Sequence, residues 1–517
     1  MPATEQPEQI DVLASGAALP SHADIVIVGS GFSGLAMAVA LKRSGREDFL
    51  ILERGSDVGG TWRDNSYPGC ACDVPSHLYS LSFAPNSDWT STFSSQPEIW
   101  QYLRRVAKQQ DLLSHVHLGC ELERADYDGD TQRWRLETSS GPLSARVLIA
   151  GAGPLSEPAI PEIPGLEHFE GKIFHSATWD HEHDLSGERV AVIGTGASAI
   201  QFVPQIQPQV QKLHLFQRTA PWVMPRPDRK LTRFERLLYR HVPAAQRAMR
   251  AIIYWGRETY AIPLLRVRLS PITEKAARVH LRRQVPDAVL RAKLTPDYKP
   301  GCKRILLSND FLPTVGRPNV ELVTDGIKWV GTHAITTADG TERPVDTIIF
   351  GTGFHVTDPP IAERVHDADG RSLAERWNVS LEAHRGTTVA GFPNLFVLLG
   401  PNTGLGHTSV VVMAEAQVTY VQRALEYMDA HGIGTIEPRR EAQSAWNARV
   451  QRRMKGTVWT AGGCSSWYID HNGRSSALWP DFTFRFRRAL SRFDAAEYRL
   501  APVAAPKPEP TPTEVAA

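Results

Sequence analysis

The chain has 517 residues, of which 42% are hydrophobic and 22% are charged, which is the composition of an ordinary globular protein. Its 57 Lys and Arg almost balance its 56 Asp and Glu, so the formal net charge of +1 excludes a surface that binds nucleic acid over its whole extent. Roughly three to four domain-sized units are expected, stable without disulfides or a structural metal.

The cysteines and the two termini narrow the class of protein further. Five cysteines, none in a CxxC pair, argue against a secreted disulfide framework, a zinc ribbon and a thioredoxin-type dithiol, and Cys70 and Cys72 are interpreted as packing or turn residues. Residues 1–22 lack the features of a signal peptide and no apolar run predicts a membrane span, so a cytoplasmic location is expected. A flexible arm is predicted over residues 1–22 and a Pro-rich disordered tail over residues 499–517.

The first dinucleotide-binding pattern occupies residues 24–53, where a buried strand, a GxGxxG turn, a helix and a second strand follow one another. Gly29 allows the tight turn, Gly31 lets the backbone approach a pyrophosphate, and Gly34 lets the helix pack on the strand. Glu53 ends the second strand and is expected to accept both hydroxyls of an adenosine ribose. Because its charge would repel a 2′-phosphate, this site favours FAD or NAD over NADP.

A second strand, turn, helix and strand carry Gly194, Gly196 and Ala199 at the same spacing. No acid ends the second strand of this copy, and Arg218 and Thr219 stand there instead. A guanidinium and a hydroxyl suit a 2′-phosphate, so this site is predicted to prefer NADPH over NADH.

The order of the apolar runs predicts how the chain is divided. Runs over 146–150 and 346–350 end in glycine pairs and are expected where the chain crosses between domains, and the loop 400–407 is predicted to cradle a flavin edge. The predicted fold class is α/β, with two Rossmann-like dinucleotide-binding domains, the FAD domain split in sequence and a helical insertion in the NADPH domain. The predicted units are the arm 1–22, the first segment of the FAD domain 23–155, a linker 156–185, the NADPH domain 186–345 with its insert at about 225–300, the second segment of the FAD domain 346–498 and the tail 499–517.

The insert is rich in arginine. Between Arg233 and Arg268 eight arginines stand against two glutamates, with apolar residues interleaved. A helical insertion with one solvated face is the favoured interpretation, and the alternative is a basic amphipathic surface that touches a membrane or guides an apolar substrate.

The linker carries a fingerprint. Residues 169–180 read Phe-x-Gly-x-x-x-His-x-x-x-Trp-Asp, which resembles the FxGxxxHxxxW(D/P) fingerprint of the type I Baeyer–Villiger monooxygenases, and the order of the other motifs resembles that family over residues 23–495. The resemblance implies an enzyme of the EC 1.14.13 class that uses FAD and NADPH. It would convert a small ketone with O2 into an ester or lactone, through a peroxide at C4a of the reduced flavin. For His175 the resemblance implies a role in domain coupling, which we favour over proton transfer.

The resemblance also assigns roles to single residues. Arg304 and Asp73 match the catalytic arginine of the family and its paired carboxylate, and a fixed cation stabilises developing negative charge where water is excluded. Lys303 is implied to reach the 2′-phosphate beside Arg218 and Thr219. The remaining cofactor contacts implied by the family are those of Thr61, Trp62, Asp73 and Tyr79, and no metal is expected.

Two other functions stay open at this point. One is an N- or S-oxygenating flavin-containing monooxygenase, and the other is a protein that binds FAD and NADPH as a redox sensor without oxygenating a substrate. The pair Arg304 and Asp73 favours attack on a ketone over both. Residues 462–468 are interpreted as a loop that closes over NADPH. The sequence predicts no nucleic-acid partner and no transmembrane segment, and it leaves the ketone and the oligomeric state, monomer or small homo-oligomer, undetermined.

Overall fold

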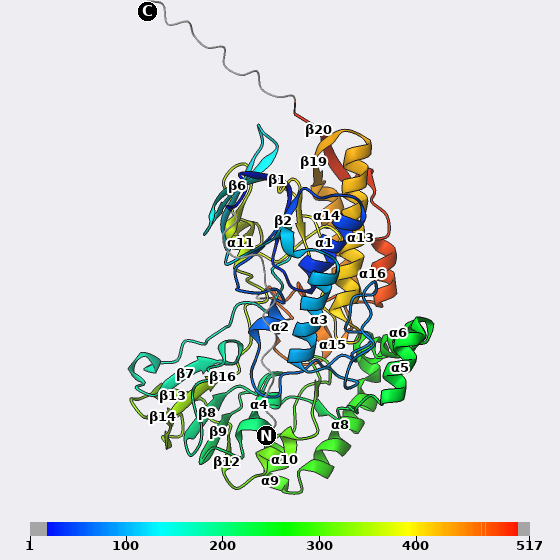
Figure 1. Ribbon diagram of the computed structural model, residues 1–517. Helices are drawn as coiled ribbons and strands as arrows, with labels where there is room; N and C mark the ends of the chain where they lie inside the picture. Colours follow the sequence, from blue (N-terminus) through cyan, green and yellow to red (C-terminus); the bar gives the residue numbers. More distant parts are fainter. Residues whose placement is uncertain (1–17, 467, 471, 505–517) are drawn as a thin grey trace, which may run out of the picture.

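The computed structural model describes residues 18–466, 468–470 and 472–504. Residues 1–17 of the predicted arm and residues 505–517 of the predicted tail lie outside this part of the chain. Two sheets, one in each half of the molecule, form the framework (Figure 1). The first is mixed, and the second is parallel throughout. The predicted α/β fold class is confirmed.

The first sheet has eight strands in the order β17-β4-β5-β6-β1-β2-β3, with β18 also paired to β6. Its parallel portion consists of β3, β2, β1, β6 and β18, and the apolar runs of the sequence account for it because strands buried on both faces need apolar side chains throughout. The strands are β1 (His22–Val28), β2 (Phe49–Glu53), β3 (Val116–Leu118), β4 (Leu122–Asp128), β5 (Arg133–Thr138), β6 (Gly141–Ala150), β17 (Val365–His366) and β18 (Leu395–Val397).

The second sheet has five parallel strands in the order β12-β9-β8-β16-β7. Strands that are distant in sequence therefore meet in it, since β16 lies between β8 and β7. They are β7 (Lys172–His175), β8 (Arg189–Ile193), β9 (Lys212–Phe216), β12 (Val320–Val323) and β16 (Thr347–Phe350).

Sixteen α-helices are present in the described part of the chain. The short ones at turns are α2 (Thr61–Asp64), α7 (Ala261–Leu265), α10 (Phe311–Val315), α11 (Ile361–Arg364), α12 (Leu373–Arg376) and α15 (Val458–Ala461). The longer ones are α1 (Phe32–Arg43), α3 (Gln96–Gln109), α4 (Ala199–Ile206), α5 (Arg233–His241), α6 (Pro243–Glu258), α8 (Ser270–Gln284), α9 (Ala288–Lys293), α13 (Val410–Ala430), α14 (Arg440–Met454) and α16 (Thr483–Ala489).

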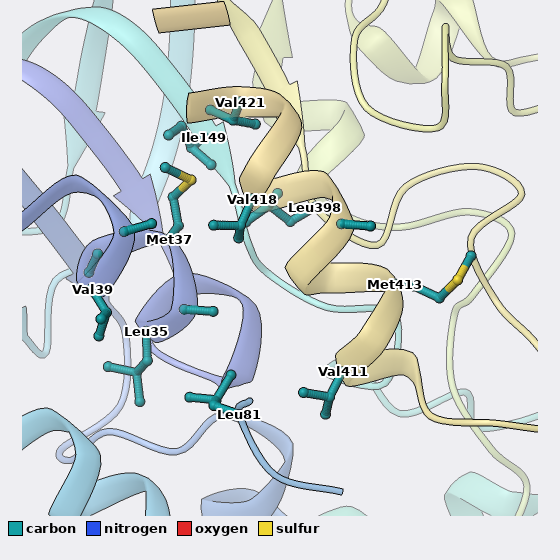
Figure 2. Packing of buried hydrophobic residues seen from close by; sticks show 14 of the residues in the cluster. Leu35, Met37, Val39, Leu81, Ile149, Leu398, Val411, Met413, Val418 and Val421 are labelled. Carbon is teal, nitrogen blue, oxygen red and sulfur yellow. The ribbon is translucent and has the colours of Figure 1, made fainter. Parts of the chain in front are cut away.

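The largest core lies between the first sheet and the helices α1 and α13. Figure 2 shows Met37 of α1, Ile149 of β6 and Val418 of α13 converging in it, and all three are buried. Residues from the beginning, middle and end of the chain thus form one core, and their burial fixes where the turns after β1 and β18 lie.

Three small sheets complete the fold: β10 (Val223–Met224) with β11 (Leu306–Leu307), β13 (Ile327–Val330) with β14 (Ala334–Thr337) and β15 (Glu342–Pro344), and β19 (Ile433–Pro438) with β20 (Tyr498–Pro502). The last pair corrects one prediction. Residues 499–502, assigned to a disordered tail, belong to β20, because the backbone of this segment pairs with β19 and the Tyr498 side chain is buried. Composition alone did not reveal that pairing partner.

A disulfide joins Cys302 and Cys464, which are separated by 162 residues. It was not predicted, since the sequence shows no spacing that pairs these two cysteines. Cys70 and Cys72 are buried and free, in agreement with their interpretation as packing residues.

Candidate active site

The turn after β1 has the geometry that its three glycines predict. Gly29 has φ +96°, and a Cβ on it would come within 2.8 Å of the Gly151 carbonyl oxygen, which leaves no room for a side chain. A Cβ on Gly34 would collide with the Gly29 carbonyl oxygen, so this glycine permits the close packing of α1 on the turn. A Cβ on Gly31 would meet only the Gly60 Cα, at 3.8 Å. The backbone at Gly31 therefore faces open space at the N-terminus of α1, where a pyrophosphate fits.

Glu53 lies beside this turn and is almost fully buried. It accepts hydrogen bonds from the Ser30 backbone N–H (3.0 Å) and hydroxyl (2.6 Å), from the Gly55 N–H (2.8 Å) and from the Arg63 guanidinium (2.7 Å). Burial acts to raise the pKa of Glu53, but Arg63 and these donors outweigh it, and the pKa lies below its usual value. The carboxylate is thus ionised and rigid. A ribose hydroxyl bound here would replace the Ser30 hydroxyl.

The residues implied for the flavin gather around α2. Thr61 and Trp62 begin this helix directly after Gly60, which has φ +52°. The Trp62 indole N–H donates to the Tyr79 hydroxyl at 3.1 Å, and the two rings meet edge to face at 5.5 Å. Phe32, at the start of α1, contacts Tyr79 in the same way at 5.1 Å. These aromatic rings form a wall next to the open space over Gly31.

The second turn repeats the geometry of the first. Gly194 has φ +108°, and its N–H donates to the Phe216 carbonyl oxygen at 3.0 Å. A Cβ on Gly196 would meet only the Gly351 carbonyl oxygen, at 3.7 Å, and Ala199 is fully buried where α4 starts. The backbone is again open at a helix N-terminus, which fits a second pyrophosphate.

Arg218 and Lys303 come together at the edge of the second turn although 85 residues separate them in the sequence. Burial lowers the pKa of Lys303, the positive charge of Arg218 lowers it further, and Asp297 partly compensates. The Lys303 ammonium lies 5.3 Å from the centre of the Tyr298 ring. Arg218 is exposed and Thr219 half-buried at the end of β9. Two cations held this close favour a dianion between them.

Arg304 and Asp73 form a bidentate ion pair between the two halves of the molecule. The Arg304 Nε and Nη2 atoms each donate to one Asp73 carboxylate oxygen at 2.7 Å. Asp73 raises the pKa of Arg304 far above its usual value. Burial acts to raise the pKa of Asp73, but the Arg304 charge outweighs it and the net pKa is lowered. Both groups are therefore charged at neutral pH, and the guanidinium and carboxylate side chains remain 37% and 26% exposed.

Two further residues reach this pair. The sequence did not assign Arg257 to the site, and it included Tyr468 only as the last residue of the predicted loop 462–468. The Arg257 guanidinium on α6 donates to the Asp73 carbonyl oxygen at 3.1 Å, and its charge also helps to lower the pKa of Asp73. Tyr468 is 3% exposed, and its hydroxyl hydrogen-bonds with Arg304. Arg257 was counted only as one cation of the arginine-rich insert. A signal was present in the sequence. Arg257 is two residues after Trp255, so the helical period of 3.6 residues places it on the opposite side of α6, away from the exposed face.

The segment 462–466 lies against Cys302 through its disulfide, so the predicted loop touches the residues that precede Lys303. Trp467, which the sequence analysis included in this loop, lies outside the described residues. The predicted flavin cradle 400–407 follows β18, which is parallel to β6 and so ends at the same sheet edge as Gly151.

His175 ends β7 and is 1% exposed. Its Nδ1 atom accepts a hydrogen bond from the Ala177 N–H at 3.1 Å, which caps the short 3-10 helix Ser176–Thr178. Burial lowers the pKa of His175 to about 4. A buried neutral imidazole with a capping role suits the structural interpretation of this residue.

The described residues contain no cluster of three or more His, Cys, Asp or Glu side chains that could hold a metal. None of their helices is both long and apolar enough to cross a membrane.

Two dinucleotide turns in one chain, together with an ion pair of Arg304 and Asp73, are the features of a pyridine-nucleotide-linked oxidoreductase. The family model described as "Pyridine nucleotide-disulphide oxidoreductase" matches residues 26–234. The chain is 50% identical over 499 residues to a Baeyer-Villiger monooxygenase of Streptomyces coelicolor, covering 96% of this chain and 95% of the relative. The chain belongs to the Baeyer–Villiger monooxygenase family, as its motifs predicted.

Solved structures agree with this assignment. Cyclohexanone monooxygenase from Rhodococcus sp. Phi1 bound to NADP+ superimposes with a TM-score of 0.82 at 27% identity, over 93% of this chain and 99% of that one. A structure of OTEMO in complex with FAD and NADP gives a TM-score of 0.83 at 26% identity, over 93% and 99% of the two chains.

Proposed function

We propose that this protein is an FAD- and NADPH-dependent monooxygenase of the EC 1.14.13 class that inserts one oxygen atom of O2 beside the carbonyl of a small ketone, giving an ester or lactone. The bidentate ion pair of Arg304 with Asp73, in a chain that also has two dinucleotide turns, supports the proposal. When bound, FAD accepts hydride from NADPH and activates O2. The residues of the chain bind and orient the cofactors and the ketone, and Arg304 places a positive charge in the site.

Arg304 acts as a fixed cation. Its guanidinium cannot lose a proton at any relevant pH, and Asp73 holds it by two hydrogen bonds. A cation fixed in this position would stabilise an oxyanion that develops on the ketone, because a preorganised charge needs no reorganisation as the oxyanion forms. The same positive charge would favour an anionic, nucleophilic oxidant over its protonated form. That is the form required to attack an electrophilic carbonyl.

Each of the two turns would bind a different cofactor. Gly29, Gly31 and Gly34 with Glu53 suit the pyrophosphate and ribose of FAD, and Thr61, Trp62 and Tyr79 suit its isoalloxazine end. Gly194, Gly196 and Ala199 suit the pyrophosphate of NADPH, and Arg218, Thr219 and Lys303 suit its 2′-phosphate. The buried Glu53 would leave a 2′-phosphate at the first turn next to a negative charge, so NADPH is directed to the second.

Substitution of Arg304 tests the proposal. In the Arg304→Ala variant, anaerobic reduction of the flavin by NADPH should proceed within a fewfold of the wild-type rate. Ester formation from cyclohexanone or a linear ketone should fall by about a hundredfold or more, as when a group that stabilises an oxyanion is removed. NADPH consumption should then appear as hydrogen peroxide. Ester formation near the wild-type rate would show that Arg304 does not have this role.

The matched control is Arg54→Ala, because Arg54 pairs with Glu157 at the surface and not with the catalytic pair. This variant should keep both reactions. Sulfide oxidation without any ester from a ketone panel, in the wild-type protein, would assign the chain to the N- or S-oxygenating monooxygenases instead.

A further inference from the structure

The outward face of α6 is apolar, which is the reverse of an ordinary surface helix. Ala248, Ile252 and Trp255 recur at a helical spacing of three to four residues and are all exposed, Ile252 to 66% and Trp255 to 57%. The opposite side of the helix carries Tyr254 and Glu258, which are buried. Apart from Arg247, the exposed residues of α6 are therefore apolar, whereas polar groups of Tyr254 and Glu258 face the protein.

The apolar surface continues onto α16. The Trp255 and Phe484 rings lie 5.9 Å apart, and Phe484 is 37% exposed. The two helices are locked together, because the Thr483 N–H donates to the Glu258 carboxylate at 3.0 Å and the Thr483 hydroxyl contacts the Tyr254 hydroxyl at 3.0 Å. Because α6 and α16 are held together, the exposed Trp255 and Phe484 rings form one continuous apolar surface.

Helix α5 adds two exposed apolar side chains, Phe234 at 73% and Leu237 at 52%. In Figure 1 the helices α5, α6 and α16 lie along the same side of the molecule. We call the surface formed by five residues of these helices the docking face: Phe234, Leu237, Ile252, Trp255 and Phe484.

Positive charge is concentrated in the chain around the docking face. Residues 231–283 hold twelve Lys and Arg against three Asp and Glu, whereas the rest of the chain holds 45 against 53. All three acids have partners within the chain: Glu235 pairs with Arg229, Glu258 contacts Thr483, and Glu274 pairs with Arg278 and Lys299. Arg247, Arg266 and Arg268 are exposed and have no ion pair within the described residues. The net charge of this region is strongly positive although the whole chain is nearly neutral.

A cleft rich in arginine opens beside the docking face. The Arg485 guanidinium, which lines it, lies 5.9 Å from the centre of the Phe484 ring. Among the described residues, Arg449, Arg488 and Arg492 in this cleft make no ion pair. The cleft has a volume of about 680 Å³, and its arginines are Arg385, Arg449, Arg453, Arg485, Arg488 and Arg492.

We propose that the docking face binds the surface of a membrane that contains anionic phospholipid. The apolar side chains would enter the boundary between headgroups and acyl chains, where Trp is favoured, and phosphate groups would occupy the arginine cleft. A second copy of this chain is disfavoured as the occupant, because a symmetric contact would bring two positive surfaces together. An acidic soluble protein would satisfy the arginines but would leave the exposed rings of α6 and α16 without a matching environment.

The proposed contact is close to the proposed active site. The inward side of α6 carries Arg257, which donates to the Asp73 carbonyl oxygen. The membrane would therefore lie about one helix diameter, ~10 Å, from the segment that holds the catalytic carboxylate. The membrane contact itself does not depend on the proposed reaction.

Vesicle sedimentation tests the proposal with the full-length, FAD-loaded protein. Sucrose-loaded vesicles of equal parts phosphatidylcholine and phosphatidylglycerol should sediment the protein, and vesicles of phosphatidylcholine alone should not. Added NaCl should weaken the binding. The variant Ile252→Ser/Trp255→Ser should bind about tenfold more weakly because it loses two buried apolar side chains. The variant Arg488→Glu/Arg492→Glu should lose a comparable factor or more because it reverses two charges.

The matched controls carry the same changes at exposed positions elsewhere. Trp329→Ser replaces a ring that is 43% exposed on β13, and Arg317→Glu reverses an exposed charge after α10. Both should bind anionic vesicles like the wild type. The melting temperatures of all variants, followed by circular dichroism, should match that of the wild type within a few degrees. A loss of binding would then not result from unfolding of the variant.

Five outcomes would overturn the proposal. The first three are no sedimentation with anionic vesicles, equal binding to both kinds of vesicle, and unchanged binding by both docking-face variants. The fourth is retention on polyglutamate without vesicle binding, which would indicate an acidic protein partner, and the fifth is competition by a soluble phosphate. A soluble ligand is separated by adding inorganic phosphate. Phosphate should compete no better than NaCl at the same ionic strength, and stronger competition would assign the cleft to a free phosphate compound and not to a bilayer.

Discussion

Cys302 and Cys464 are bonded to each other immediately next to the proposed catalytic pair. Cys302 precedes Lys303 and Arg304 in the chain, and Cys464 lies four residues before Tyr468, which is buried beside Arg304. The bond therefore fixes the segment that holds Lys303, proposed to bind NADPH, and Arg304, proposed to be catalytic, against a segment 162 residues later.

Loss of this bond should lower both stability and cofactor affinity. Closing a long loop constrains the unfolded chain, so the Cys302→Ser/Cys464→Ser variant should lose about 2–4 kcal/mol of unfolding free energy in urea. Its KM for NADPH should rise because Lys303 is held less firmly. A reductant should reproduce both effects in the wild type and change nothing in the variant. An identical urea midpoint for the wild type with and without reductant would contradict this prediction.

Asp73 should matter through its charge. In the Asp73→Asn variant the guanidinium of Arg304 keeps one acceptor and loses its ionic partner. We expect ester formation to fall by about tenfold to a hundredfold, since a misplaced group that stabilises an oxyanion contributes less. Product analysis and peroxide detection in the same reaction measure the loss. Asp73→Glu should recover some of the coupling, and an Asn variant as tightly coupled as the wild type would rule out the role.

Lys303 and Arg218 should select NADPH over NADH. If each donates the proposed charge-assisted hydrogen bond to the 2′-phosphate, worth about 1.5–3 kcal/mol, either alanine variant should raise the KM for NADPH by about tenfold to a hundredfold. The KM for NADH should stay within twofold. Steady-state kinetics with both cofactors provides the measurement. Lys299→Ala is the control, because Lys299 pairs with Glu274. Equal losses with the two cofactors would mean that these cations do not contact the 2′-phosphate.

Arg257 should act as a positioning residue for Asp73. The Arg257→Met variant keeps the length and apolar packing of the side chain but removes the hydrogen bond to the Asp73 carbonyl oxygen. We expect kcat for ester formation to fall about tenfold, in proportion to the loss of one hydrogen bond to a charged group, with the KM for NADPH unchanged. Arg257→Lys should restore some of kcat. If Arg257→Met alters the melting temperature but not kcat, Arg257 has only a structural role.

His175 should make the protein less stable in mild acid. Burial lowers its folded-state pKa from 6.5 to about 4, so the unfolded chain binds the proton more readily. The free energy of unfolding should be unaffected above pH 6.5, decrease as the pH falls from 6.5 to about 4, and level off below that. The loss from this residue should reach roughly 3 kcal/mol.

The variant His175→Asn tests this dependence, because Asn keeps a capping acceptor for the Ala177 N–H and does not titrate. Its urea stability should fall less steeply between pH 6.5 and 4 than that of the wild type. His77, whose pKa burial also lowers to about 4, remains in both proteins and accounts for some of the slope they share. Parallel pH profiles for the wild type and the variant would contradict the assignment to His175.

Several elements could be predicted because their causes are local. The strands beside Gly29 and Gly194 are apolar runs that end in glycines, and both turns have the positive φ that such glycines permit. Glu53 ends β2 and Arg218 stands two residues after β9. The assignment of ribose to the first and 2′-phosphate to the second therefore needs only the local order of residues, and it stays a prediction. The fingerprint around His175 indicated the family, and close relatives confirm it.

The sequence by itself thus determined the two dinucleotide turns, the fold class and the family, since these depend on the order of neighbouring residues. The pairing of Arg304 with Asp73 is implied by the family resemblance, and the structure confirms it. Only the tertiary structure decided which other distant residues meet. Cys302 with Cys464 and Arg257 with the Asp73 backbone are contacts between segments that no periodicity links. The same holds for β20, whose partner strand lies 60 residues earlier, and for the outward apolar face of α6, since a helical pattern shows that one face is apolar but not whether the fold covers it. Long-range packing sets these pairings, because each of them is stable only when the cores between the segments have formed.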